Sequence, residues 1–241
     1  MSDPTWFTRP GGDTAGRLNL AYDALDRQVI GGRADEPALR TPEDDLSYAV
    51  LLERAAAFGG LLLALGVRPG DAVAVPASIS TETAVVVLAA ARIGATTWIG
   101  GACADLVRSS DSPLVVAEGV QMADVVAALE TLAPGRPRAV VVVRPGEWVV
   151  DETRDVAWEL ALKAGATDPA TVVPVDADAA IVVASSGESY ASSAHGDIAA
   201  VATGDARSEP AVLRAGAAWT TALVGDLLTA LRTGQGAVLE A

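Results

Sequence analysis

Residues 67–99 read VRPGDAVAVPASISTETAVVVLAAARIGATTWI, and their pattern indicates the fold class. Its opening turn residues lead into an apolar strand predicted at 72–75. A helix is predicted at 82–93 and ends at Gly94, and a second apolar strand is predicted at 96–99. Strands that are continuously apolar and alternate with helices are typical of a parallel sheet covered on both faces. The stretch therefore predicts a strand–helix–strand unit of an α/β fold.

The same alternation continues on both sides of this unit. Upstream, a helix is predicted at 48–65, with Ser47 as its N-cap and Gly66 as its end. Downstream, three apolar strands alternate with three helices, predicted at 113–117, 122–132, 139–143, 151–164, 180–184 and 219–231. We therefore expect an α/β fold of three layers, a sheet with helices on both faces. A boundary near Thr171 divides it into a first α/β subdomain (1–170) and a partial second one (171–241).

Composition excludes several classes of protein. Of the 241 residues 51% are hydrophobic, which is enough for a substantial core and too many for a disordered chain. The 17 Lys+Arg and 31 Asp+Glu leave a net charge of −14, which argues against a nucleic-acid or anionic-membrane surface. The N-terminus lacks the pattern of a signal peptide, and the most apolar stretch is too short to span a bilayer. We expect a soluble, cytoplasmic protein.

Three reactive residue types occur once each, as Lys163, His195 and Cys103. Any mechanism that requires a lysine must therefore use Lys163 or a lysine from another chain. Cys103 stands at a possible helix start, where the helix dipole could lower its pKa, but a small buried cysteine is the commoner outcome. The carboxylates at 151–155 are explained by capping of the helix predicted there, and the pair Asp176 and Asp178 is explained by solvation, without a metal.

The loop after the strand at 180–184 reads Ser185-Ser186-Gly187-Glu188-Ser189. Small side chains leave backbone N–H groups free to bind phosphate, so the loop is a candidate phosphate site. Its single glycine, its missing lysine and the negative charge of Glu188 favour a plain strand-to-loop turn instead. His195 with Ser185, Ser186 or Ser193 suggests a nucleophile and base, but the Gly-x-Ser-x-Gly spacing is absent. A surface or hydrogen-bonding histidine is expected, and the residues alone indicate no catalytic constellation.

Several segments nevertheless resemble the acyl-adenylate-forming superfamily, which includes acyl-CoA synthetases, adenylation domains and luciferases. The resemblance rests first on Gly66–Asp71, on Glu82 and on Leu88–Ala95, which reads LAAARIGA. The segments Trp6-Phe7 and Leu18–Arg27 look most like the acetyl- and propionyl-CoA synthetase branch. The tail from Trp219 to Leu239 is similar as well, so the resemblance runs, with gaps, along nearly the whole chain. It implies the N-terminal part of an acyl-CoA synthetase fold.

The resemblance weakens at the phosphate loop of that family, which reads approximately Thr-Ser-Gly-Thr-Thr-Gly-x-Pro-Lys-Gly with a histidine shortly after. Ser185-Ser186-Gly187 corresponds to its start, and His195 to the later histidine. Glu188 replaces a hydroxyl residue, Tyr190 stands where the second glycine is expected, and Ser193 is near the lysine position. Tyrosine adopts the positive φ that glycine tolerates only at an energetic cost. The resemblance thus implies a vestigial phosphate loop of Ser185, Ser186, Gly187, Ser189 and His195, with no catalytic residue and no metal ligand.

The family's adenine and magnesium motif, its ribose-binding aspartate and its C-terminal domain with the catalytic lysine have no counterpart in the 241 residues. The leading hypothesis is therefore a truncated, non-catalytic acyl-CoA synthetase-like protein that acts as a binding, scaffolding or regulatory subunit without a cofactor. One alternative is half of a split acid–thiol ligase, which would use ATP and magnesium once a partner chain completes it. Another is a protein that binds a small ligand or acyl group. A homo-oligomer or a protein partner is expected, because the surface that later segments cover in the family must be covered otherwise.

Overall fold

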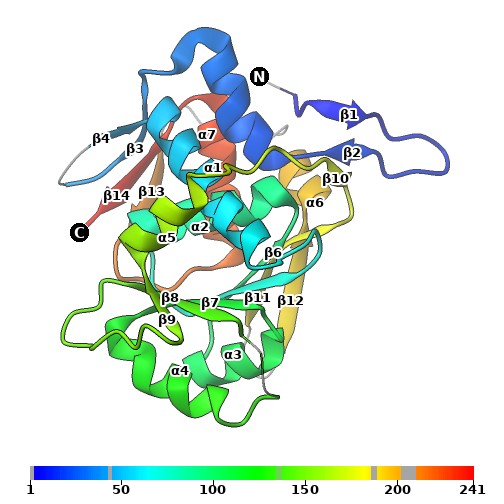
Figure 1. Ribbon diagram of the computed structural model, residues 1–241. Helices are drawn as coiled ribbons and strands as arrows, with labels where there is room; N and C mark the ends of the chain where they lie inside the picture. The colour runs from blue at the N-terminus through cyan, green and yellow to red at the C-terminus, as the bar shows by residue number, and fades with distance from the viewer. Residues whose placement is uncertain (1–2, 43–44, 134, 136, 186–188, 202–209) are drawn as a thin grey trace.

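The computed structural model describes residues 3–42, 45–133, 135, 137–185, 189–201 and 210–241. A seven-stranded sheet forms its centre, in the order β12-β11-β6-β5-β7-β8-β9 (Figure 1). All neighbouring pairs are parallel except β11 and β12, which are antiparallel. The strands are β5 (Ala72–Val75), β6 (Thr96–Ile99), β7 (Leu114–Glu118), β8 (Ala139–Val143), β9 (Asp155–Ala157), β11 (Ala180–Ser185) and β12 (Tyr190–Ala194).

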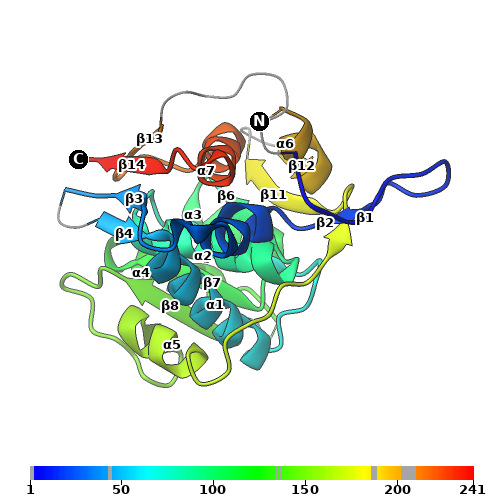
Figure 2. The ribbon, with the colours of Figure 1, turned by 90° about the horizontal axis from the view of Figure 1, so that it is seen from above.

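Helices cover both faces of this sheet, as Figures 1 and 2 show. One face carries α1 (Tyr48–Ala64), α2 (Thr81–Ile93) and α5 (Trp158–Gly165), and the other carries α3 (Cys103–Ser110) and α4 (Met122–Leu129). Adjacent strand residues point to opposite faces, so Val73 and Val116 enter the larger hydrophobic cluster while Ala74 and Val115 enter the smaller one. The predicted three-layer α/β architecture is confirmed.

The helix ends follow the capping residues of the sequence. The Ser47 hydroxyl accepts a hydrogen bond from the backbone N–H of Val50 at 3.3 Å. Ser47 is therefore the N-cap of α1. Gly66 has a φ of +81° just beyond the end of that helix. Ser80 and Thr83 form a capping box at the start of α2, and Gly94 ends this helix at a φ of +75°. The strand–helix–strand unit predicted from residues 67–99 is thus confirmed in detail.

A second, mixed sheet packs beside the first, in the order β13-β14-β3-β4. Its strands are β13 (Ala211–Arg214), β14 (Ala237–Glu240), β3 (Pro37–Arg40) and β4 (Asp45–Ser47), and α7 (Thr221–Thr233) packs against it. Strand β14 pairs with β3, and β11 pairs with β6. Segments on either side of residue 171 therefore share both sheets, and the subdomain boundary there stays a prediction.

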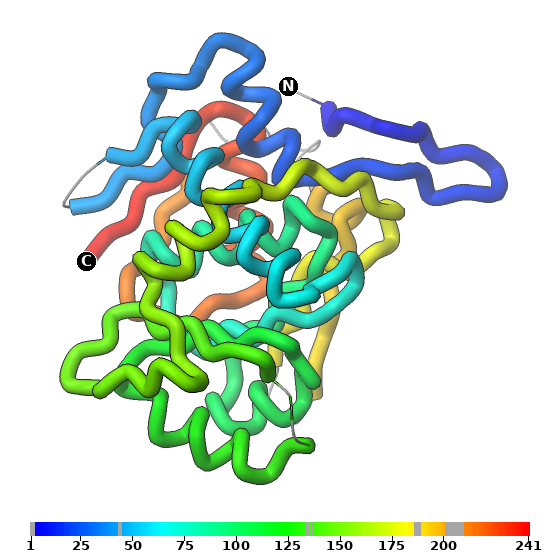
Figure 3. Tube along the Cα trace, in the orientation of Figure 1, coloured from blue at the N-terminus to red at the C-terminus, as the bar shows by residue number. Residues whose placement is uncertain are grey.

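The N-terminal segment forms an arm. Strands β1 (Trp6–Thr8) and β2 (Arg17–Leu18) form a hairpin that extends from the body, and β2 also pairs with β10 (Val175–Asp176) (Figure 3). The remaining short elements are the π-helical turns η1 (Tyr22–Asp26) and η2 (Val29–Arg33), the 3-10 turn η3 (Gly119–Gln121) and helix α6 (His195–Val201). None of the helices in the described part of the chain is long and apolar enough to cross a bilayer.

The helix predicted at 151–164 is wrong in its first half, because the chain there forms a turn and the strand β9. The buried Asp155 carboxylate accepts hydrogen bonds from the Trp148 indole at 3.1 Å and from the Asp151 backbone at 3.1 Å. It also pairs with Arg154 at 2.6 Å. These partners hold the segment extended beside β8, and α5 begins only at Trp158. Asp155 is therefore an internal anchor of the loop and does not cap a helix.

Candidate functional site

The order of the strands places the expected ligand site of this sheet at one position. The run β6-β5-β7-β8-β9 follows the order 2-1-3-4-5, in which the chain reverses its winding direction between the first and third strands. Ligands of open α/β sheets bind beyond the carboxyl ends of the strands at such a reversal. In this chain the reversal lies between β5 and β7, so the segments after Val75 and Glu118 flank the site.

A polar cluster that the sequence analysis missed spans this position. The Glu118 carboxylate accepts hydrogen bonds from the Ser78 backbone N–H at 2.7 Å and from the Ser78 hydroxyl. The Arg144 guanidinium reaches the same oxygen at 2.8 Å, from the segment that follows β8. Gln121 donates to the Pro76 carbonyl oxygen at 2.8 Å. The protein's own side chains thus join the segments that flank the crevice, and the position of Glu118 at a strand end could have indicated this cluster.

Ser185, the first residue of the candidate phosphate loop, ends strand β11. Gly101, at a φ of +74°, packs so closely that a Cβ atom on it would lie 2.8 Å from the Ser185 hydroxyl oxygen. Ser189 follows as an exposed residue. Ser186, Gly187 and Glu188 lie outside the described residues. Ser185 is therefore at the carboxyl edge of the sheet, where the sequence resemblance expects it.

His195 lies at the opposite end of the β11–β12 hairpin from Ser185. In this hairpin Ser185 is paired with Tyr190, and Ala180 with Ala194, the residue just before His195. At about 3.3 Å per strand residue, five residues separate the two side chains by about 16 Å. The structure does not bring His195 and Ser185 together, so they form no nucleophile–base pair in this arrangement.

His195 is also fully buried, which corrects the expectation of a surface or hydrogen-bonding residue. Neither ring nitrogen has a hydrogen-bond partner among the described residues. Burial alone lowers the pKa of His195 to about 4, because the charged imidazolium loses its hydration and gains no anionic partner. The imidazole is therefore neutral at pH 7 and acts as a core side chain.

This burial makes the stability of the fold depend on pH. In the unfolded chain His195 has a pKa of about 6.5, so it takes up a proton there at a higher pH than in the folded chain. The stability that it contributes is complete above pH 6.5 and is lost as the pH falls towards 4. Between pH 7 and pH 5 we expect His195 to lower the free energy of unfolding by about 2 kcal/mol. Urea unfolding of the wild type and of His195→Leu at both pH values measures this difference. An equal pH dependence in both proteins would contradict it.

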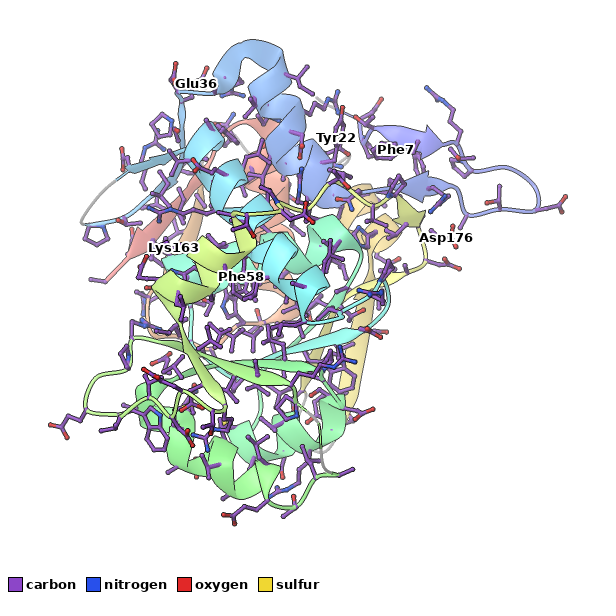
Figure 4. The ribbon with its side chains drawn as sticks, in the orientation of Figure 1. Phe7, Tyr22, Glu36, Phe58, Lys163 and Asp176 are labelled. Atoms are coloured by element: carbon purple, nitrogen blue, oxygen red, sulfur yellow. The ribbon has the colours of Figure 1, made fainter. Side chains whose placement is uncertain are left out.

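Lys163, the single lysine, lies far from the candidate loop. It is exposed on α5, which packs against β8 and β9, whereas Ser185 belongs to β11 (Figure 4). Because β9 and β11 are separated by four other strands, at about 4.8 Å per step, the two sites are on the order of 20 Å apart. Lys163 therefore cannot supply the positive charge that the loop lacks.

The other candidates from the sequence carry no chemistry in this arrangement. Cys103 is half-buried at the start of α3, and burial together with the charge of Asp124 raises its pKa to about 11. The thiol is therefore protonated at neutral pH, and the buried alternative describes it better than an activated one. Across the described ranges, no three histidine, cysteine, aspartate or glutamate side chains gather closely enough to hold a metal ion.

Comparison with known proteins extends this picture. The model of the family described as AMP-binding enzyme matches residues 25–187, about two-thirds of the chain. An acetyl-coenzyme A synthetase of Streptomyces avermitilis is 34% identical over a match of 163 residues. The match covers 59% of this chain and 25% of that enzyme. Its counterpart in Streptomyces coelicolor is 40% identical over 85 residues, 33% of this chain and 13% of that enzyme. The chain thus spans a quarter or less of the length of these relatives.

Solved structures show the same fold. The crystal structure of a Brucella canis acyl-CoA synthetase superposes with a TM-score of 0.75 at 20% identity, covering 97% of this chain and 45% of that one. A mutant coronafacic acid ligase from Pectobacterium brasiliense superposes with a TM-score of 0.73 at 13% identity, covering 92% of this chain and 45% of that one. At these identities the likeness establishes the architecture and no activity.

Proposed function

Because the chain belongs to the AMP-binding enzyme family, we propose that it is a non-catalytic member, acting as a binding, scaffolding or regulatory subunit. One observation carries the proposal: the single lysine of the chain lies far from the segment that corresponds to the family's phosphate loop. The loop sequence contains Glu188 and no lysine. Lys163 is on the order of 20 Å away, on the helix beside the opposite edge of the sheet. A polyphosphate bound at this loop would therefore lack the lysine that the family's phosphate loop carries.

The position of His195 supports the same proposal. A catalytic group must reach the reacting atoms, and His195 is buried at the end of the hairpin away from Ser185. It therefore serves the packing of α6 and β12. With the loop lysine and a reachable histidine both missing, the retained α/β body is a scaffold for binding.

Calorimetric titration tests the binding half of this proposal. We expect ATP with magnesium, acetate, propionate and coenzyme A each to bind no more tightly than about 1 mM, because the loop sequence contains Glu188 and lacks the family's lysine. The acetyl-coenzyme A synthetase of Streptomyces avermitilis, titrated under the same conditions, serves as the positive control. Binding of ATP in the micromolar range would contradict the proposal.

A further inference from the structure

The outer edge of β12 is an exposed sheet edge that carries neither charge nor proline, and its pairing with β11 is irregular only between Ala180 and Val182. Strand β12 reads Tyr-Ala-Ser-Ser-Ala, and β11 is its only partner strand among the described residues. Natural edge strands are commonly blocked by charged residues, by proline, by a bulge or by being very short. The opposite edge follows this rule, because β9 has three residues and contains Asp155. Strand β12 carries neither a charge nor a proline over its five residues.

The hydrogen-bonding groups of this edge face outward at alternate residues. The backbone N–H of Ala194 points away from β11, since it donates to the Asp197 carboxylate at 3.2 Å. Backbone groups alternate in direction along a strand, so the N–H and C=O of Ser192 and of Tyr190 face the same way. Among the described residues no backbone partner occupies these two positions, so they can pair with an added strand.

A groove with two acidic residues on its lining lies where β11 begins and β12 ends. It has a volume of about 460 Å³, and Ala180, Ser192 and Ala194 are among the small residues that line it. Asp178 and Asp197 line the same groove, and both carboxylates are exposed. Neither of them forms an ion pair with a described arginine or lysine. The small residues leave room for a backbone, and the carboxylates favour positively charged side chains next to it.

We propose that the β12 edge and this groove form a docking site for an extended basic segment of a partner protein. The segment adds to the sheet as a strand beside β12, and its lysine or arginine side chains pair with Asp178 and Asp197. The net charge favours a basic partner over a second copy of this chain, because two chains that each carry a net charge of −14 repel one another. The inference rests on the proposed binding function and names the chemistry of the partner.

The test uses the capped peptide Ser-Arg-Thr-Arg-Thr-Arg-Ser, labelled with fluorescein, and the full chain. We expect fluorescence anisotropy to show at least tenfold tighter binding than for two control peptides. In one control glutamate replaces each arginine, and in the other the threonine nitrogens are methylated so that they cannot donate hydrogen bonds. In the proton–nitrogen correlation spectrum, the amide signals of Tyr190 and Ser192 are expected to shift. Equal binding of the methylated peptide would overturn strand addition, as would an absence of binding.

Variants of the chain locate the site. The double change Asp178→Asn with Asp197→Asn removes both charges, keeps an acceptor for the Ala194 N–H, and is expected to weaken peptide binding at least tenfold. Glu159→Gln removes an exposed carboxylate from α5, at the far side of the sheet, and is expected to leave binding unchanged. An equal loss in both variants would overturn the site. Failure of the peptide to bind leaves the non-catalytic proposal intact, because only nucleotide binding or turnover contradicts that.

Discussion

Gly165→Ala is expected to lower the free energy of unfolding by about 3 kcal/mol, because α5 and α1 cross there with their backbones in contact. A Cβ atom at position 165 would overlap the carbonyl oxygen of Ala57 and lie 2.8 Å from the backbone nitrogen of Leu61. Both obstacles are backbone atoms, so the two helices must separate to admit a methyl group. Thermal unfolding measures the change, and a loss of this size lowers the Tm of a chain of this length by about 8 °C.

Gly225 provides the matched control for this substitution. It also lies within a helix, α7, but nothing occupies the space within 4 Å of a Cβ atom there. Gly225→Ala is therefore expected to raise the free energy of unfolding by about 0.5–1 kcal/mol, since alanine is the better helix former. If Gly165→Ala proved as harmless as Gly225→Ala, the close crossing of α1 and α5 would be wrong.

The second large effect is expected at Arg92, where Arg92→Met should cost about 3 kcal/mol. Its guanidinium nitrogens lie 2.5 and 3.1 Å from the two carboxylate oxygens of Asp26, and its Nε donates to the Ala170 carbonyl oxygen at 2.8 Å. Both side chains of the ion pair are mostly buried, at 8% and 17% exposure. Without the arginine, a carboxylate and a carbonyl remain in the interior with no partner. Urea unfolding measures the loss.

Two further variants separate burial from charge. Arg108→Met removes an ion pair with Asp105 whose side chains are 42% and 71% exposed, and should cost less than about 0.5 kcal/mol. Adding Asp26→Leu to Arg92→Met removes the stranded carboxylate and is expected to restore about 2 kcal/mol of the loss. No recovery in the double variant would show that Asp26 is not the partner that makes Arg92 important.

The sheet and its main helices could be predicted from the sequence because their signals are local. Apolar strands and capping residues such as Ser47 and Gly94 act within a few residues, and the structure confirms them. Strand β12 and helix α6 were missed, because small residues such as Ala191 and Ser192 have no hydrophobic pattern, and their conformation depends on pairing with β11. The start of α5 was misplaced for a related reason, since the long-range partners of Asp155 hold β9 extended.

The candidate site was predictable only in part. The sequence predicts a buried strand that ends just before Ser185, and in the structure Ser185 is the last residue of that strand. It gave no sign that His195 is buried or that it lies at the far end of a hairpin from Ser185, since both depend on the antiparallel register of β11 and β12. The cluster of Ser78, Glu118 and Arg144 joins three segments far apart in the sequence, so only the strand order brings it together.

We propose that this chain has the AMP-binding fold without the family's chemistry, and ATP–pyrophosphate exchange is the direct test of this proposal. The assay contains the pure chain, ATP, magnesium and either acetate or propionate, with the Streptomyces avermitilis acetyl-coenzyme A synthetase as positive control. Exchange equal to that of a blank without protein is the predicted result, because no lysine lies near the Ser185 loop. Exchange by the chain alone that depends on the added carboxylate would contradict the proposal that this chain is non-catalytic.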